Sequence, residues 1–188
     1  TNAPMTLSHQ QMLAIWKLRQ GFTPQRTDCT ADIINAIDID TILSMQIRDW
    51  YINLLDNADI RYLVTTDISS RLTPQPHPSG TVTIHLPDGI RRITHIKLKG
   101  WQRPAAVIRA DRDPALASRQ ANPHTRGGPV NPVAIHYPPD TVLLYTLPDD
   151  ADPMIETATA VILPPENTYT LDPSALTLIP LPASIRSI

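Results

Sequence analysis

Six histidines, one cysteine and two glutamates are the residues of this chain best suited to metal binding or catalysis. His85 and His95 lie on either side of the turn Pro87-Asp88-Gly89, and across a hairpin the two rings could begin a metal site. Neither histidine has a cysteine or a carboxylate at ligand spacing, and two ligands alone rarely hold a metal ion. We therefore expect no metal site and interpret both histidines as outward-facing strand residues.

Cys29 is the only thiol, so an intramolecular disulfide is impossible. It lies at the start of an expected helix, where the pKa of a thiol can be lowered, but no base partner is identifiable. Glu156 and Glu166 are distant in sequence from every histidine, and the chain has neither a glycine-rich phosphate loop nor a nucleophile elbow. We expect no catalytic residue, no cofactor and no enzymatic activity.

The charges are unevenly distributed along the chain, although their sum is only −2. Residues 91–126 carry nine Lys or Arg against two Asp, a net charge of +7. Residues 127–188 carry −6 and residues 1–90 carry −3. Three arrangements explain such polarity: nucleic acid on the basic segment, head-to-tail contacts between copies, or basic and acidic segments folded against each other in one subunit.

Trp101 lies within the basic segment. Because aromatic residues and Arg dominate interface energetics, we expect it to be an interface residue, with a core position as the alternative. The candidate interface residues are Trp101, Arg103, Arg109, Arg112, Arg119, Asn122 and Arg126. If the protein is a nucleic-acid-binding module, Trp101 would stack on a base. If it is an extracellular or periplasmic β-domain, Trp101, Tyr137 and Tyr145 would line a groove for a glycan or peptide.

Helices are expected in the first third of the chain. A capping box at Ser8 predicts a helix that ends at Gly21, and a second helical region is expected from about Asp28, with a new cap at Asp38 or Asp40. Its apolar stripe requires a partner surface, either the rest of the chain or a neighbour. The stripe consists of Ile42, Met45, Ile47, Trp50, Leu54 and Leu55.

Short strands are expected in the remainder. Eighteen of the 20 prolines follow residue 73, which excludes a mainly helical structure there. Strands are predicted at 60–66, 81–86, 90–98, 104–108, 130–137, 141–147 and 157–164, with 81–86 and 90–98 forming a hairpin and 71–80 a polar Pro-rich connection. The predicted fold class is α+β, a short N-terminal helical part followed by an antiparallel β-rich domain with Pro-rich connections.

The sequence suggests three regions: a helical region at 1–57, a β-rich domain at 58–165 and a Pro-rich C-terminal arm at 166–188. The arm either crosses to another subunit or lies along its own domain. No run of about 18 apolar residues is present, so we expect no membrane association, and no signal peptide is visible.

Several different short motifs follow one another in a characteristic order over roughly residues 45–165. They include Leu86-Pro87, Trp101–Pro104, Gln120–Pro123, Pro132, Tyr145 and Pro148. In this order the chain resembles neck or ring proteins, the head-to-tail connectors of tailed phages that infect Bacteroidetes, the crAss-like group among them. It differs from that pattern at Asp88-Gly89, where an aromatic residue is usual, and at His124 after Asn-Pro.

The resemblance implies a non-enzymatic structural virion protein. Such a protein forms a homo-oligomeric ring at the neck, between the portal and the tail, and acts as an adaptor around the DNA channel. It is assembled in the host cytoplasm, and its partners are further copies, the portal, and tail or other neck proteins. Because the segment after the basic one is acidic, we expect no tight, specific binding of nucleic acid.

Overall fold

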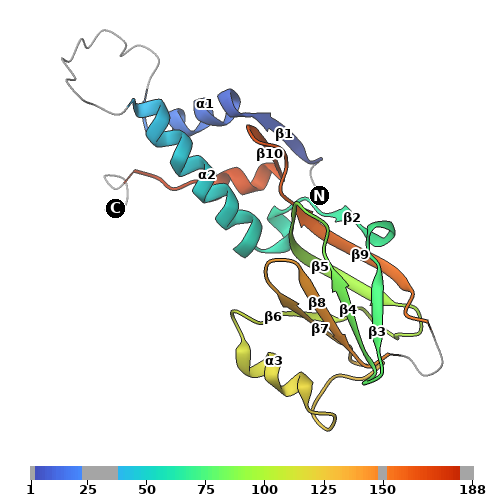
Figure 1. The fold of residues 1–188 in the computed structure, drawn as a ribbon. Helices are drawn as coiled ribbons and strands as arrows, with labels where there is room; N and C mark the ends of the chain where they lie inside the picture. The colour runs from blue at the N-terminus through green and yellow to red at the C-terminus, as the bar shows by residue number, and fades with distance from the viewer. Residues whose placement is uncertain (1–2, 23–37, 148–151, 183–188) are drawn as a thin grey trace. The chain divides into compact units, whose positions relative to one another are not determined.

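The computed structural model describes residues 3–22, 38–147 and 152–182 of the chain (Figure 1). It divides the chain into two compact units: unit 1 comprises Thr1–Val64 with Pro164–Ile188, and unit 2 comprises Thr65–Leu163. Helices and mostly antiparallel sheets both contribute, so the predicted α+β class is confirmed. Within the three described ranges, no helix combines the length and apolar character needed to cross a bilayer.

Unit 1 is built from both ends of the chain. Its elements are β1 (Met5–Ser8), α1 (His9–Arg19), α2 (Ile39–Asn57), η1 (Ile60–Tyr62), β10 (Thr168–Leu171) and η3 (Pro173–Leu178). β1 and β10 form an antiparallel two-stranded sheet in which Leu7 lies opposite Tyr169. The segment expected as a separate arm at 166–188 therefore belongs, as far as residue 182, to a folded unit with the N-terminal helices, because its strand pairs with β1.

The helix boundaries of unit 1 follow from local hydrogen bonds. The N–H of Gln11 donates to Ser8 Oγ and the N–H of Ser8 donates to Gln11 Oε1, which confirms the predicted capping box. Gly21 follows α1 with φ 79°, a conformation that glycine adopts without steric cost. Asp38 caps α2, as expected, by accepting the N–H of Asp40. The expected helical start near Asp28, and Cys29, lie outside the described residues.

The apolar stripe of α2 differs in part from the predicted one. The buried residues of α2 are Leu43, Ile47, Tyr51, Leu54 and Leu55. By contrast, Ile42 is 42% exposed and Met45 is 66% exposed. The prediction placed these two residues on the buried side, but the helix turns them outward.

The described residues of unit 2 form two sheets, one α-helix and the short 3-10 helix η2 (Ser69–Arg71). The five-stranded sheet has the order β3 (Pro74–His77), β4 (Thr81–His85), β8 (Thr141–Tyr145), β7 (Val133–Tyr137) and β6 (Ala106–Arg109). The three-stranded sheet has the order β2 (Thr66–Asp67), β9 (Ile155–Ile162) and β5 (Ile90–Leu98). β6 and β7 are parallel, and helix α3 (Pro114–Ala121) lies in the connection between them, as parallel pairing requires a crossover.

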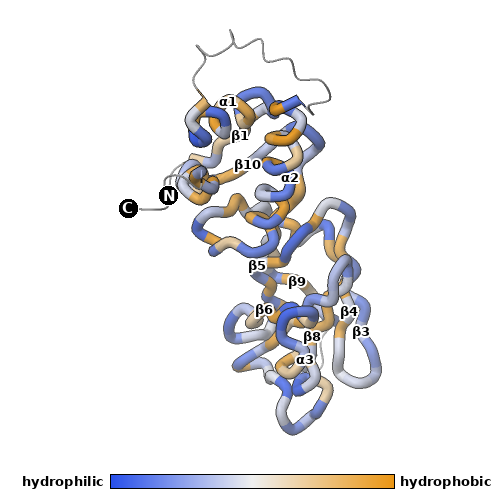
Figure 2. Tube along the Cα trace, turned by 90° about the vertical axis from the view of Figure 1, so that its left-hand side faces the viewer, coloured by the Kyte–Doolittle hydropathy of each residue, from blue (hydrophilic) through white to orange (hydrophobic). Residues whose placement is uncertain are grey.

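The core of unit 2 lies between its two sheets. Apolar side chains of β4 and β8 meet those of β5 and β9 there, and these strands carry hydrophobic stretches along the tube in Figure 2. The opposite face of the five-stranded sheet is covered by α3, where Ala117 packs with Ile135 and Tyr145. Unit 2 is therefore a sandwich of two sheets with a helix on the outer face of one of them.

Three strand predictions for unit 2 and its border are wrong. β4 and β5 do not form a hairpin, because β4 pairs with β3 and β8 whereas β5 pairs with β9. The turn at Pro87-Asp88-Gly89 instead carries the chain from one sheet to the other, across the shared core. Residues 60–66 form the short helix η1 and only the first residue of β2. The Pro-rich connection contains β3, which proline permits because β3 is an edge strand.

Candidate functional site

Trp101 lies in the core of unit 2 and not at its surface. The side chain is 3% exposed, and its Nε1–H donates to the carbonyl oxygen of Thr146 at 3.1 Å. The interface prediction for Trp101 is therefore wrong, since the ring fills space between the two sheets. For the same reason Trp101 cannot stack on a base.

The aromatic groove suggested for a glycan or peptide does not form. Trp101 belongs to the core between the sheets, whereas Tyr145 is buried under α3 on the other face of the five-stranded sheet. Tyr137 is 39% exposed beside Tyr145. Burial raises the pKa of Tyr145, and its hydrogen bond with Tyr137 adds to this effect. The three rings therefore do not share one surface.

The predicted interface arginines divide into paired and exposed groups. Arg109 binds Asp111 through two hydrogen bonds of 2.8 and 3.1 Å, and this contact lowers the pKa of the Asp111 carboxyl. Arg103, Arg112 and Arg119 are exposed. Arg103 and Arg119 make no side-chain hydrogen bond or ion pair with any described residue. These two arginines are available to a partner, whereas Arg109 is already bound within its own chain.

Asn122 and Arg126 belong to the loop that follows α3. Asn122 Oδ1 accepts the N–H of His124 at 2.9 Å, so this side chain shapes the loop. Arg126 is half-buried near Tyr145. The charge of Arg126 partly opposes the rise that burial causes in the pKa of Tyr145. The loop is held to the sheet through Gly127, whose N–H donates to Gln120 Oε1 and whose carbonyl accepts the hydroxyl of Thr146.

The charge polarity along the sequence largely cancels within unit 2. Residues 65–163 contain ten Lys or Arg and nine Asp or Glu, a net charge of +1. Lys97 of β5 illustrates this, because it forms an ion pair of 2.9 Å with Glu156 on the adjacent strand β9. The basic and acidic segments thus meet within one subunit, which was one of the three arrangements expected.

The histidines considered as metal ligands lie apart. His85 is on β4 and His95 is on β5, in different sheets. His95 Nε2 is 2.8 Å from Thr157 Oγ1 on the neighbouring strand. In the described parts of the chain, no group of three or more His, Cys, Asp or Glu side chains is placed to hold a metal ion.

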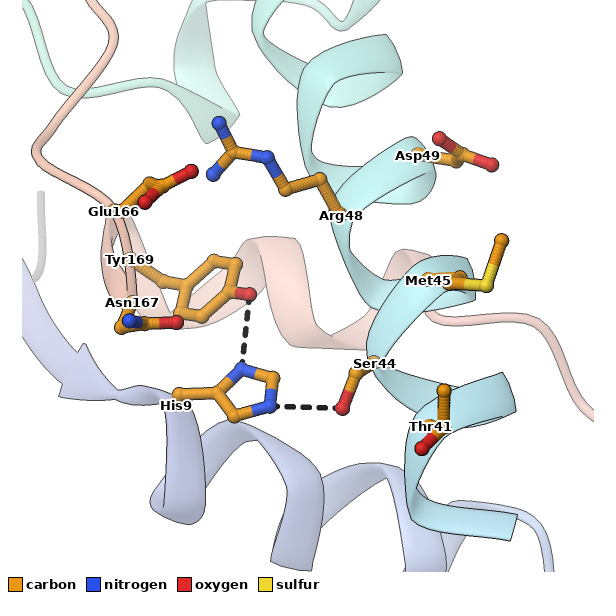
Figure 3. Close-up of a pocket in the computed structure, with 9 residues that line it drawn as sticks. All are labelled: His9, Thr41, Ser44, Met45, Arg48, Asp49, Glu166, Asn167 and Tyr169. Atoms are coloured by element: carbon orange, nitrogen blue, oxygen red, sulfur yellow. Dashed lines mark hydrogen bonds between the residues drawn. The ribbon is translucent and has the colours of Figure 1, made fainter. Parts of the chain in front are cut away.

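A pocket of about 420 Å³ lies in unit 1 between α2, the start of α1 and the start of β10 (Figure 3). Its volume is within the range of small-ligand sites. It is lined by His9, Thr41, Ser44, Met45, Arg48, Asp49, Glu166, Asn167 and Tyr169. None of these residues was predicted as a site residue.

The hydrogen bonds within the pocket determine which atom donates between His9 and Ser44. Ser44 Oγ donates its only hydrogen to the carbonyl oxygen of Asp40 at 2.6 Å. His9 Nε2, 2.8 Å from Ser44 Oγ, must therefore carry a hydrogen and donate it. His9 Nδ1 lies 3.2 Å from the hydroxyl of Tyr169. Since His9 donates to Ser44, it does not activate this serine as a nucleophile.

The mouth of the pocket, in contrast, has polar groups that are not bonded to each other. We define the rim as Met45, Arg48, Asp49 and Glu166. The Arg48 guanidinium and the Glu166 carboxylate point toward each other in Figure 3. Among the described residues, none forms a side-chain hydrogen bond or ion pair with Arg48, Asp49 or Glu166. Burial raises the pKa of Tyr169 beneath them, and the charge of Arg48 opposes that effect.

The pocket joins residues that are distant in sequence, since His9 and Tyr169 are 160 positions apart. The one local signal is on α2, where Thr41, Ser44 and Arg48 follow at spacings of three and four and hence share a helix face. The chain matches no family model and no curated protein. Any functional assignment therefore depends on the residues themselves.

Proposed function

We propose that the protein is a non-enzymatic structural virion protein, a neck ring or head-to-tail adaptor that links portal and tail around the DNA channel of a tailed phage. The order of short motifs over residues 45–165 supports the phage assignment. The chemistry of the surface supports an assembling subunit. The proposal places the protein in the virion neck, after assembly in the host cytoplasm.

One observation carries the assembly part of this proposal: two unlike surfaces of the same chain expose charged side chains that have no bonded partner among the described residues. Arg103 and Arg119 of unit 2 are exposed cations without a bonded anion among the described residues. Unit 1 has an exposed apolar and acidic surface at Met45 and Asp49. A contact between two different surfaces repeats from copy to copy and closes into a ring when the rotation allows it.

The mass of the full chain in solution tests this proposal. We expect mass photometry and sedimentation velocity to show assemblies of many copies that dissociate on dilution, and negative-stain images to show closed rings. A chain that stays monomeric up to its solubility limit, or that forms only twofold dimers, would contradict the proposal. A monomer that binds glycans or peptides would favour the extracellular alternative.

A further inference from the structure

We propose that the rim of the unit 1 pocket binds the arginine surface of unit 2 from a second copy of this chain. We use the name arginine surface for two groups of exposed residues of unit 2, Arg103 with Val130 and Arg112 with Leu116 and Arg119. This inference rests on the proposed function, because it names the residues through which neighbouring copies would meet. The contact joins unlike surfaces and is therefore of the head-to-tail kind.

The rim has the composition of a protein-binding surface. Met45 is 66% exposed, the highest exposure of the large apolar residues on α2. Beside it are two carboxylates, Asp49 and Glu166, against one guanidinium, Arg48, so the rim has a net charge of −1. An apolar side chain surrounded by charged groups is the usual arrangement of a contact surface, with an apolar centre and a polar border.

The floor of the pocket supports a role for the rim rather than for the interior. His9, Ser44 and Tyr169 already bond to one another, so they offer few free groups to a small molecule. Arg48, Asp49 and Glu166 have no such side-chain partners among the described residues, and neither do the lining side chains of Thr41 and Asn167. The arrangement thus favours a partner that covers the mouth and binds carboxylates there.

The arginine surface has the complementary composition. Leu116 and Arg119 are three positions apart on α3 and lie on neighbouring parts of the helix surface, and Leu116 is 37% exposed. Val130 is 47% exposed on a segment held next to Arg103 by the hydrogen bond from the Gln102 N–H to the Pro129 carbonyl. Guanidinium groups bind carboxylates through two parallel hydrogen bonds, which suits Asp49 and Glu166.

The net charges of the units favour the same pairing. Unit 1 contains nine Asp or Glu and six Lys or Arg, a net charge of −3, whereas unit 2 has +1. Contact between unit 1 of one copy and unit 2 of the next brings opposite charges together. A symmetric contact between two rims would instead bring carboxylates together, which is unfavourable.

Charge reversal on each side, and on both sides together, tests the contact in the full chain. The rim variant is D49K/E166K, and the arginine-surface variant is R103E/R119E. We expect each to raise the concentration for half-assembly at least tenfold. The variant with all four substitutions should recover most of the loss, because the charges are exchanged and not removed. Matched controls are D88K and K99E, which reverse exposed charges elsewhere on unit 2.

The outcomes separate this inference from the proposed function. If the wild-type chain forms rings and the paired reversals affect assembly no more than D88K and K99E, the contact is wrong and the ring proposal stands. Loss of assembly in each variant without recovery in the fourfold variant shows that the rim binds another surface, and it also overturns the contact. Wild-type chain that never assembles contradicts the proposed function itself. Unchanged melting temperatures would show that each variant remains folded.

Discussion

Units 1 and 2 differ in how many of their large apolar side chains are exposed. Among the described residues, unit 1 exposes eight large apolar side chains and unit 2 exposes four. Those of unit 1 are Leu18, Phe22, Ile39, Ile42, Met45, Ile60, Leu178 and Leu181. Among the described residues, unit 2 therefore covers its large apolar side chains more fully than unit 1 does.

In unit 2, a network of hydrogen bonds also holds the loops to the core. The carbonyl of Thr146 accepts from Trp101, and the hydroxyl of Thr146 donates to Gly127. Gly127 in turn donates to Gln120, which is 6% exposed. If the comparison is correct, substitutions in this network destabilise unit 2 alone.

The largest effect is expected for Trp101→Ala. Removing a buried Trp from the core should lower the unfolding free energy of unit 2 by about 3–5 kcal/mol, because the cavity cannot fully close. Hydrogen exchange of the full chain should show faster exchange in β4, β5, β8 and β9 and unchanged exchange in α1 and α2. The remaining tryptophans, Trp16 and Trp50, lie in unit 1, so their fluorescence reports that unit separately. An equal loss in both units would contradict the comparison.

A smaller loss, about 1–3 kcal/mol, is expected for Gly127→Ala. A Cβ atom there would overlap the carbonyl oxygen of Asn131 and lie 2.9 Å from Val133 Cγ2, so the backbone must shift. Gly128→Ala is the matched control, because a Cβ atom there meets nothing within 4 Å. Urea denaturation of both variants measures the difference, and equal midpoints would contradict the prediction.

In unit 1, Tyr51→Phe is expected to cost about 1–2 kcal/mol. The Tyr51 hydroxyl donates to the carbonyl of Thr170 at 2.9 Å and accepts the Thr170 N–H at 3.0 Å, so both groups of β10 lose a partner. Faster hydrogen exchange at Thr170, with unit 2 unchanged, is the measurement. Unaltered exchange there would show that water replaces the hydroxyl.

Alkaline pH should lower the stability of the wild-type chain more than that of Tyr51→Phe. Burial raises the pKa of Tyr51 to about 12, above the ordinary value of 10.0. The unfolded chain therefore loses this proton first, and the stability that depends on it falls as the pH rises from about 10 to about 12. In Tyr51→Phe this part of the decline is absent, which denaturation at several pH values can measure.

The smallest signal is expected when duplex DNA is added to the protein. Because unit 2 has a net charge of only +1, we expect weak or no binding at about 0.15 M salt. Fluorescence anisotropy is the measurement, and each phosphate contact would contribute a slope of about 0.9 in log affinity against log salt. Submicromolar binding with a steep slope would favour the nucleic-acid alternative.

Local signals predicted the helices of unit 1 and most strands of unit 2. The capping hydroxyl of Ser8 and the carboxylate of Asp38 act within three residues of their partners, so sequence spacing determines them. Alternation at Val82 and Ile84 likewise predicted β4. What alternation could not predict was pairing, since β4 and β5 carry the correct pattern but join different sheets.

Strand β5 shows why a period of two is insufficient. Its buried residues Ile90, Ile93 and Ile96 are three positions apart, because register shifts interrupt the pairing with β9 between them. Each extra residue of a bulge turns the following side chain to the other face, so the spacing changes to three. Such bulges have no strong sequence signal.

Of the two surfaces in the proposed contact, only the arginines of unit 2 were among the residues singled out from the sequence as interface candidates. The arginines at 103 and 119 are conspicuous in a charged segment, and both lie at the surface. The rim was missed because it depends on Arg48 of α2 and Glu166 before β10, residues distant in sequence that meet where Tyr51 of α2 bonds to Thr170 of β10. Non-local contacts of this kind have no local pattern.

The discontinuity of unit 1 also has a consequence for synthesis on the ribosome. The ribosome synthesises β1 before unit 2, whereas the partner strand β10 is synthesised only after all of unit 2. Unit 2 is continuous in sequence and can fold as soon as it leaves the exit tunnel, as domains generally do. The rim cannot exist until residues near the end of the chain are added, since Glu166 contributes to it. If copies assemble through the rim, as proposed, translation order keeps incomplete chains from joining the assembly.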